Sequence, residues 1–305
     1  MANVLIGGGT GMIGMRLSEL LAAKGHQVSH LSRTRNMEAR FPAFQWDINT
    51  KTIDEEAVKQ ADYIINLAGA GIADKLWSEK RKKIIIDSRV YSTLILKKAI
   101  EEHRPDLKAF LSASAIGFYG DRGEQVLTEK SEAGEEEQFL VRSVLEWEDS
   151  VEEVAKTGVR TALIRIGLVL STKGGALPKI LLSTNVNVGG YFGNGQQWYA
   201  WVHLDDLCQM FIHLIENDNL SGVFNGTAPN PERNKTFTQK VGDALDKNLL
   251  LIPAPAFGLK FAMGEMSTTV LNSARVLPKR IEESGFEFDY PELTMALRDL
   301  VENGK

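Results

Sequence analysis

A cluster of glycines near the start of the chain is the feature best suited to chemistry. The residues run Gly7-Gly8-Gly9-Thr10-Gly11-Met12-Ile13-Gly14, between an apolar segment and a helical one, and no Gly-Lys-Ser/Thr of a Walker A loop follows. Glycines at this spacing permit a tight turn, let backbone N–H groups approach a pyrophosphate and let a helix pack closely on a strand. The helix N-terminus adds partial positive charge. We therefore predict a dinucleotide site with contacts from Gly8, Gly11, Met12, Ile13 and Gly14.

The end of the second predicted strand indicates which dinucleotide binds. An NAD site usually has Asp or Glu there, about 20 residues on, to hold the ribose 2′-hydroxyl. This chain reads Leu31-Ser32-Arg33-Thr34-Arg35, with no acid until Glu38. Guanidinium groups make forked, charge-assisted bonds to phosphate, so we predict NADP(H), held at its 2′-phosphate by Ser32, Arg33 and Arg35. The alternative is that both arginines are ordinary solvated surface residues.

A parallel sheet is needed to position these residues. Short β-branched runs alternate with helical segments in the first half of the chain, the pattern of a parallel sheet covered by helices. A helical stripe runs from Leu140 to Val154, and a helix near Asp206–Glu216 precedes a strand near Val223–Asn225. The main strands are predicted at Asn3–Ile6, Gln27–Leu31, Ala43–Trp46, Tyr63–Leu67, Ala109–Ser112 and Thr161–Ile166.

The second half has a different texture. After Leu170, glycine-rich and polar loops appear, and the tail is mostly helical with prolines between the helices. We predict the α/β fold class: a doubly wound parallel sheet (Rossmann) with a smaller, mostly helical C-terminal substrate domain. Residues 1–170 form the NADP-binding domain, with 201–227 returning to it, and residues 171–200 and 228–305 form a substrate-binding cap.

Composition excludes several classes of protein. The chain has 305 residues, 35 basic and 40 acidic side chains and a net charge of −5, so it has no basic footprint for nucleic acid or an anionic membrane. Its single cysteine, Cys208, excludes a disulfide framework and a cysteine-rich metal site. No apolar run approaches the roughly 20 residues of a membrane span, and the apolar start lacks the basic leader of a signal peptide. We expect a cytoplasmic protein without a metal.

Several segments resemble one enzyme superfamily. With the glycine loop, Asn66–Gly69 and Tyr119-Gly120 make the chain similar to the extended short-chain dehydrogenase/reductases. Ser112–Gly120, Gly193–Asp206 and Arg275–Arg280 narrow the resemblance to an atypical branch, the "epimerase family" of nucleotide-sugar-epimerase-like proteins with a C-terminal domain of unknown function. The resemblance covers essentially the whole chain.

The resemblance implies further cofactor contacts. The turn with Leu67, Ala68 and Gly69 would border the adenosine half of the cofactor, and Asp47 would lie near the adenine, although a turn or cap residue explains Asp47 equally well. Arg165 belongs to the strand whose end approaches the nicotinamide in this family. One departure is Gly7, where the family usually has Thr or Ser.

The usual proton relay of the family is missing. Hydride-transferring relatives use a Tyr-x-x-x-Lys pair, in which the lysine lowers the tyrosine pKa and holds the nicotinamide ribose. Four residues after each of the six tyrosines stand Leu67, Ile95, Gly123, Gly195, His203 and Thr294, none of them lysine. By position the pair falls on Phe139 and Ser143, which cannot do this chemistry.

Two residues are candidate substitutes. Ser114 matches the substrate-orienting Ser or Thr of the family when the strand end is aligned from its left, although alignment from Tyr119 puts Ala115 there. Tyr119 is a candidate proton donor, and the alternative is an aromatic residue in the pocket floor. We predict Ser114 and Tyr119 as catalytic residues.

The segment Gly193–Asp206 bears on the substrate. Nucleotide-sugar epimerases place an arginine there for the diphosphate, and that position falls on Tyr199. Loss of the forked cation argues against diphosphate recognition, so we predict a flatter or more apolar small molecule in contact with Trp198, Tyr199 and Trp201. Trp201 could instead be core.

The remaining candidates have structural explanations. His203 fits a structural histidine, and Asp205 and Asp206 fit caps of the following helix. An apolar tail stripe could line the substrate cleft or form a core face; it contains Phe257, Phe261, Met263 and Met266.

Two functions remain open. The first is an NADP(H)-dependent oxidoreductase or epimerase-like enzyme with an unusual proton relay, and the second is a non-catalytic NADP(H)-binding redox sensor or scaffold. A homodimer is possible in either case.

Overall fold

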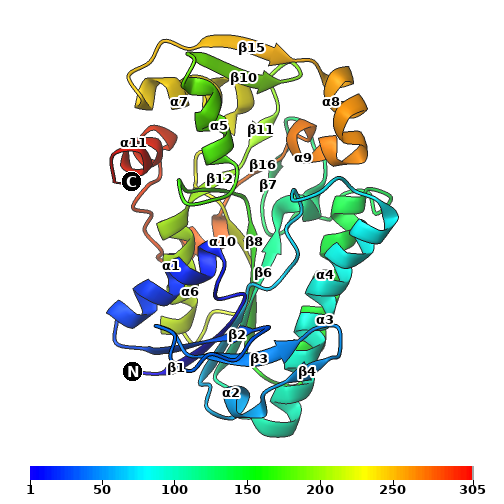
Figure 1. Ribbon diagram of the computed structural model, residues 1–305, viewed down its shortest axis with the longest axis vertical. Coiled ribbons are helices and arrows are strands. Elements are labelled where there is room, and N and C mark those ends of the chain that lie inside the picture. The colour runs from blue at the N-terminus through cyan, green and yellow to red at the C-terminus, as the bar shows by residue number, and fades with distance from the viewer. Residues whose placement is uncertain (304–305) are drawn as a thin grey trace.

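An eight-stranded sheet forms the centre of the molecule in the computed structural model, which describes residues 1–303 (Figure 1). The strand order is β13-β8-β6-β5-β1-β2-β3-β4, and all pairs are parallel except β3 with β4. The strands are β1 Asn3–Gly7, β2 Gln27–Ser32, β3 Ala43–Asp47, β4 Thr52–Ile53, β5 Tyr63–Asn66, β6 Ala109–Ala115, β8 Thr161–Ile166 and β13 Gly222–Gly226. The predicted α/β class and its doubly wound parallel sheet are confirmed.

Strand β1 is where the order of the sheet reverses. It pairs with β2 through Val4↔Val28 on one side and with β5 through Val4↔Tyr63 on the other. In open α/β sheets, ligands bind outside the carboxyl ends of the strands at such a switch point. The glycine loop follows the carboxyl end of β1, so the sheet places it at this position.

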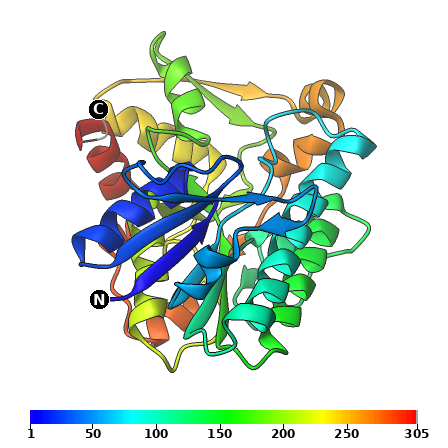
Figure 2. The same cartoon turned by 60° about the horizontal axis from the view of Figure 1, so that its bottom comes forward.

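Helices cover both faces of the sheet, as the turned view in Figure 2 shows. Helices α1 (Met12–Ala23) and α6 (Leu204–Glu216) pack together on one face, where Leu17, Leu21 and Phe211 are buried. The other face carries α2 (Glu55–Lys59), α3 (Glu79–His103) and α4 (Phe139–Ala155), and the predicted stripe of α4 is buried there at Val144, Trp147, Val151 and Val154.

A second group of elements lies above the sheet in Figure 1. Its core contains Leu170, Leu177, Trp201, Phe237 and Leu297. The larger elements are α5 Leu177–Thr184, β10 Val188–Phe192, α7 Asn234–Ala244, β15 Leu250–Ala254, α8 Ala256–Met263 and α11 Leu293–Asn303. Short elements connect them and the sheet: η1 Ile116–Tyr119, β7 Val126–Leu127, β9 Leu168–Leu170, β11 Trp198–Tyr199, β12 Trp201–His203, β14 Glu232–Arg233, η2 Gly264–Ser267, α9 Thr268–Leu271, β16 Arg275–Val276 and α10 Lys279–Glu283.

The chain passes between the two groups more than once. After β12 it returns to the sheet as α6 and β13, and β13 becomes the edge strand beside β8. Arg280 of α10 then donates to the carbonyls of Ser221 and Val223 at the start of β13. The predicted nucleotide-binding domain likewise includes a segment, residues 201–227, that returns to the sheet after the first part of the cap. The exact domain boundaries stay a prediction.

Candidate functional site

Side chains at two positions of the glycine loop would clash with neighbouring backbone. Gly8 has φ +78°, and a Cβ atom there would lie 2.9 Å from the backbone of Leu67. A Cβ atom on Gly14 would lie 2.5 Å from the carbonyl oxygen of Gly8. Helix α1 begins at Met12, has Gly11 as its N-cap and has no acidic residue in its first turn. The loop can therefore present helix N–H groups to an anion, as the sequence predicts for a pyrophosphate.

His30 supports this loop from beneath, a role that the sequence did not reveal. A Cβ atom on Gly9 would lie 2.3 Å from the His30 ring, so the ring and the loop backbone are in direct contact. His30 is 2% exposed, and its Nε2 atom lies 2.7 Å from the hydroxyl of Ser18 on α1. Burial lowers the pKa of His30 to about 4, so the ring is neutral at pH 7.

The predicted phosphate-binding arginines follow β2. Arg33 is exposed, and its guanidinium has no partner among the described residues. Arg35 forms an ion pair with Asp54, the N-cap of α2, and its guanidinium lies 5.5 Å from the centre of the Phe44 ring. Ser32 is half-buried, and its hydroxyl accepts a hydrogen bond from the backbone of Thr34. Arg33 is thus the cation of this pair that is free for a ligand.

The turn after β5 is fixed by side chains of α3. Asn66 donates to the hydroxyls of Ser92 and Thr93 at 3.2 Å each, and its Oδ1 atom accepts from the backbone of Ala68. Leu67 donates from its backbone to Gly7 at the end of β1, which holds the turn beside the glycine loop. Gly69 is exposed at the tip.

Three further predicted cofactor contacts are Asp47 and, in the first turn of α1, Met12 and Ile13. The carboxylate of Asp47 accepts from the backbone of Asn49 at 2.8 Å, which is the turn role that the sequence left open. Met12 and Ile13 are partly buried at the start of α1. A Cβ atom on Gly174 would lie 3.1 Å from the sulfur of Met12, so the Gly174 loop lies next to the glycine loop.

Ser114 and Arg165 share one carboxylate. Arg165 binds Glu148 of α4 in a forked pair at 2.8 and 2.7 Å, and Ser114 donates to the same carboxylate at 2.5 Å. Arg165 is 4% exposed and also stacks on Phe118, with 3.3 Å from its guanidinium carbon to the ring centre. The structure therefore brings Ser114 and Arg165 together, in a buried network whose charge is already balanced.

Tyr119 belongs to the same network and is fully buried. Its hydroxyl can donate to Asn225 Oδ1, at 2.8 Å, or to the Thr128 carbonyl, at 3.1 Å. The same hydroxyl accepts a hydrogen bond from Arg165 at 3.1 Å. Burial raises the pKa of Tyr119, and this outweighs the effect of Arg165. Since Tyr119 has no exposed surface and its one proton is already directed at Asn225 or Thr128, this geometry argues against the predicted proton-donor role.

The two positions where the resemblance implies the Tyr/Lys pair, Phe139 and Ser143, are buried, and aromatic packing covers the first of them. Phe139, at the start of α4, is 1% exposed and contacts Trp77 edge-to-face, with 4.7 Å between the ring centres. Ser143 donates to the carbonyl of Leu140 within α4 and is 3% exposed. Lys82 of α3 lies 5.5 Å from the centre of the Phe139 ring and pairs with Glu265 of η2. The cation that contacts this position therefore comes from α3.

The three predicted substrate contacts do not share one surface. The expectation for Trp201 is wrong: it is 0% exposed in the core of the second group of elements, and it donates to the carbonyl of Asn230 at 2.9 Å. Tyr199 is half-buried, donates to the carbonyl of Val270, and has a raised pKa because of burial.

Trp198 is held between two arginines. The guanidinium groups of Arg233 and Arg275 lie 4.5 and 4.6 Å from the centre of its ring, and its Nε1 atom donates to Glu124. Glu124 also pairs with Arg233 at 2.9 Å. Trp198 and its neighbours therefore tie β11 to β14 and β16.

The residues around α6 are structural, but not all in the predicted way. His203, rather than an aspartate, caps α6 by accepting from the backbone of Asp205. Asp205 forms a forked pair with Arg16 of α1 at 2.6 and 2.7 Å. Asp206 is fully buried and accepts from the backbone of residues 289 and 290. The predicted capping role of the two aspartates is therefore wrong.

The apolar tail stripe is divided in the structure. Phe257 and Phe261 of α8 are 79% and 94% exposed, so they belong to no core. Met266 is buried and Met263 is half-buried. Cys208 of α6 is fully buried, and burial raises the pKa of its thiol.

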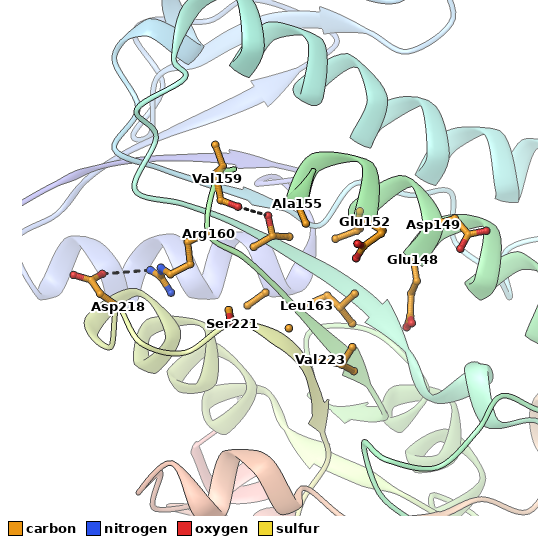
Figure 3. A pocket seen from close by; sticks show the side chains of 14 residues that line it. Glu148, Asp149, Glu152, Ala155, Val159, Arg160, Leu163, Asp218, Ser221 and Val223 are labelled. Atoms are coloured by element: carbon orange, nitrogen blue, oxygen red, sulfur yellow. Dashed lines mark hydrogen bonds and ion pairs between the residues drawn. The ribbon is translucent and has the colours of Figure 1, made fainter. Parts of the chain in front are cut away.

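A separate cavity of about 620 Å³ lies at the opposite edge of the sheet, between α4 and the amino ends of β8 and β13 (Figure 3). Val159, Leu163 and Val223 supply apolar walls. Arg160 is held there by Asp218 and by the carbonyls of Leu214 and Leu220. The glycine loop follows the carboxyl end of β1, so this cavity is distinct from the predicted cofactor edge.

Neither a metal-binding cluster nor a membrane-spanning helix is present in residues 1–303. No group of three or more His, Cys, Asp or Glu side chains there is arranged to hold a metal ion. No helix in the same range has the length and apolar character needed to cross a membrane.

Solved structures resemble this chain over its whole length. The human epimerase family protein SDR39U1, solved with NADPH, is 31% identical, aligns over 99% of both chains and gives a TM-score of 0.87. A nucleoside-diphosphate sugar epimerase from Corynebacterium glutamicum is 30% identical, with a TM-score of 0.80, over all of this chain and 59% of that one.

Sequence comparisons identify the family. The epimerase family protein YfhF of Bacillus subtilis is 36% identical over 99% of both chains, and the chloroplastic SDR39U1 homologue of Arabidopsis thaliana is 38% identical over 98% of this chain and 87% of its own length. Residues 254–300 match a domain of unknown function, DUF1731. Residues 4–225 match the NAD dependent epimerase/dehydratase family. The chain is therefore an epimerase family protein and belongs to the NAD dependent epimerase/dehydratase family.

Proposed function

We propose that this chain binds NADP(H) and acts as an oxidoreductase or epimerase-like enzyme on a small molecule. The observation that carries the choice of cofactor is the exposed, unpaired Arg33 at the end of β2, where an NAD site would have a carboxylate. The similarity to human SDR39U1, which was solved with NADPH, supports the same choice.

The residues around the switch point fit a dinucleotide. Gly8 and Gly14 allow the loop backbone to pack closely where a side chain would clash, and the N-terminus of α1 offers N–H donors to the pyrophosphate. Arg33 and Ser32 would hold the 2′-phosphate, and Leu67 to Gly69 would border the ribose. Arg35 contributes less because Asp54 already neutralises it. Bound NADP(H) would supply the hydride chemistry.

Ser114 is the better candidate of the two predicted catalytic residues. Its hydroxyl donates to Glu148, so Glu148 sets its orientation, and the forked pair with Arg165 holds that carboxylate in place. Tyr119 instead fits a positioning role, because its hydroxyl bonds to Arg165 within the same network.

A second function is a redox sensor or scaffold that binds NADP(H) without turnover. The buried Phe139, packed by Trp77 at the position where the resemblance to hydride-transferring enzymes implies a tyrosine, favours it. The predicted small-molecule ligand is common to both functions. The cytoplasmic location and the homodimer stay predictions from the sequence.

Calorimetric titration with NADPH and NADH tests the cofactor. The expected result is that NADPH binds at least tenfold more tightly, and that Arg33→Gln removes most of this difference while NADH affinity is retained. Arg40→Gln is the matched control, because Arg40 is also exposed but pairs with Glu19. Equal affinity of the unaltered protein for both nucleotides would overturn the proposal.

Turnover separates the two functions. NADPH oxidation is followed against panels of carbonyl compounds and sugar nucleotides, with Ser114→Ala as the variant. Turnover that falls at least tenfold in Ser114→Ala supports the enzyme, whereas tight NADPH binding without turnover across the panels supports the sensor.

A further inference from the structure

Helix α3 brings two arginines onto one turn. Arg89 donates from Nη1 to the carbonyl of Ala70 at 3.0 Å, and Arg81 donates from Nη2 to the carbonyl of Gly71. These carbonyls belong to consecutive residues of the segment that follows β5, so the two guanidinium groups lie on neighbouring peptide groups. In both views the N-terminal end of α3 lies close to α8, where the second group of elements meets the sheet (Figures 1 and 2).

The positive charge of this pair is poorly balanced. Among the described residues Arg89 has no carboxylate partner, and its other hydrogen bond goes to the carbonyl of Ile85. Burial and the charge of Arg81 lower the pKa of Arg89 to about 10, so Arg89 remains a cation at pH 7. Within residues 1–303, Arg81 forms an ion pair with Asp74 alone, at 3.4 Å, and the Asp74 side chain is 66% exposed. The Nε atom of Arg81 is buried and has no partner.

A buried cation without a counter-charge is costly, and a bound anion removes that cost. Each guanidinium has five N–H donors in a planar fork that matches the oxygens of a carboxylate or phosphate. The hydrogen bonds of Arg89 use Nη1, and those of Arg81 use Nη2. Among the described residues, Nη1 of Arg81 and both Nε and Nη2 of Arg89 make no hydrogen bond, so these donors remain for a ligand.

The pair lies near the position of the missing lysine. The Arg89 guanidinium is 5.1 Å from the centre of the Trp147 ring, one turn beyond Ser143 on α4. A Cβ atom on Gly69, at the exposed tip of the predicted cofactor turn, would lie 3.1 Å from the guanidinium carbon. Arg89 therefore lies next to the region where the substrate and the cofactor would meet.

We propose that Arg81 and Arg89 form a binding site for an oxyanion, a carboxylate or phosphate group, of the small-molecule substrate. This rests on the proposed function, because the substrate would bind beside the cofactor. This site would be separate from that of the cofactor's pyrophosphate, which is assigned to the N-terminus of α1. Arg81 instead bonds to Gly71, at the far end of the turn after β5. Its neighbour Lys82 pairs with Glu265 of η2, among the C-terminal elements.

Inorganic phosphate is the probe, applied to the full-length protein saturated with NADPH so that the glycine loop is blocked. Thermal unfolding is measured against phosphate concentration, with sodium chloride at equal ionic strength as the reference. The expected result is a saturable rise in Tm for the unaltered protein. Its apparent phosphate affinity falls at least tenfold in Arg89→Gln and in Arg81→Gln, and less in Arg89→Lys. Arg142→Gln, an exposed arginine of α4, is the control.

NADPH affinity is measured in the same variants. An unchanged value, together with loss of the phosphate response, supports a site separate from the cofactor. No saturable response in the unaltered protein, or the same response in the Arg89 and Arg81 variants, overturns the proposal, as does a tenfold loss of NADPH affinity with the phosphate response intact. If NADPH does not bind at all, the proposed function fails, and phosphate titration of the nucleotide-free variants still tests the arginine pair.

Discussion

At the scale of single residues, burial decides what a reactive side chain can do. Tyr119 has the residue type of a proton donor, yet its hydroxyl is fixed by Arg165 and Asn225 inside the protein. His30 is similar: its type suggests a base, but it packs under Gly9 as a neutral ring. In both cases the polar atoms stabilise the position of a neighbouring segment.

His30 gives a testable dependence of stability on pH. Its pKa is about 4 in the folded protein and about 6.5 when unfolded, so between these values the unfolded state binds more protons. Stability is therefore lost as pH falls from about 6.5 to about 4, by roughly 3 kcal/mol at about 1.4 kcal/mol per pKa unit.

The measurement is urea unfolding at several pH values in the unaltered protein and in His30→Gln. The variant is expected to lose this part of the slope. His103→Gln, which changes a partly exposed histidine, is the control. A slope that is the same in His30→Gln and in the unaltered protein would contradict the prediction.

At the scale of elements, α3 connects the sheet with the C-terminal elements. Its N-terminus is capped by Ser78, its basic first turns reach the segment after β5, and Lys82 forms an ion pair with Glu265 of η2 at 2.5 Å. The Lys82 and Glu265 side chains are 15% and 41% exposed, so this pair is partly shielded from water. A partly buried pair between distant segments restrains how far they can separate.

Removal of this ion pair should loosen η2. In Lys82→Met we expect amide hydrogen exchange in residues 264–271 to rise several-fold, consistent with a loss of about 1 kcal/mol. Lys83→Met is the matched control, because Lys83 is 71% exposed and pairs only within α3. Equal exchange in the two variants would show that the ion pair does not restrain η2.

At the scale of the whole molecule, the sheet depends on residues far along the chain. Helix α6 covers one face and β13 forms an edge, and both follow the first segment of the predicted cap. We expect a fragment of residues 1–200 to lack a cooperative unfolding transition in urea, because it leaves Leu17, Leu21 and the edge of β8 uncovered. A cooperative transition comparable to that of the full chain, followed by circular dichroism, would refute this.

Local patterns predicted the sheet and the glycine loop, because apolar runs and glycine spacing act within a few residues. Local patterns could not predict contacts between residues that are far apart in the sequence. Arg16 and Asp205 are 189 residues apart, and only the packing of α1 on α6 brings them together. Arg81 and Arg89 were not singled out in the sequence, and the turn after β5 gives them a shared position. Trp201 lies in an aromatic segment, but the return of the chain buries it.

The burial of Cys208 makes the protein a suitable background for site-specific labelling. Its thiol is inaccessible and its pKa is raised, so maleimide reagents should leave the native fold unmodified. A cysteine introduced at an exposed position, such as Phe261→Cys on α8, would then be the one reactive thiol. With a second introduced cysteine on α2, pairs of dyes could report the separation of the C-terminal elements from the sheet in single molecules.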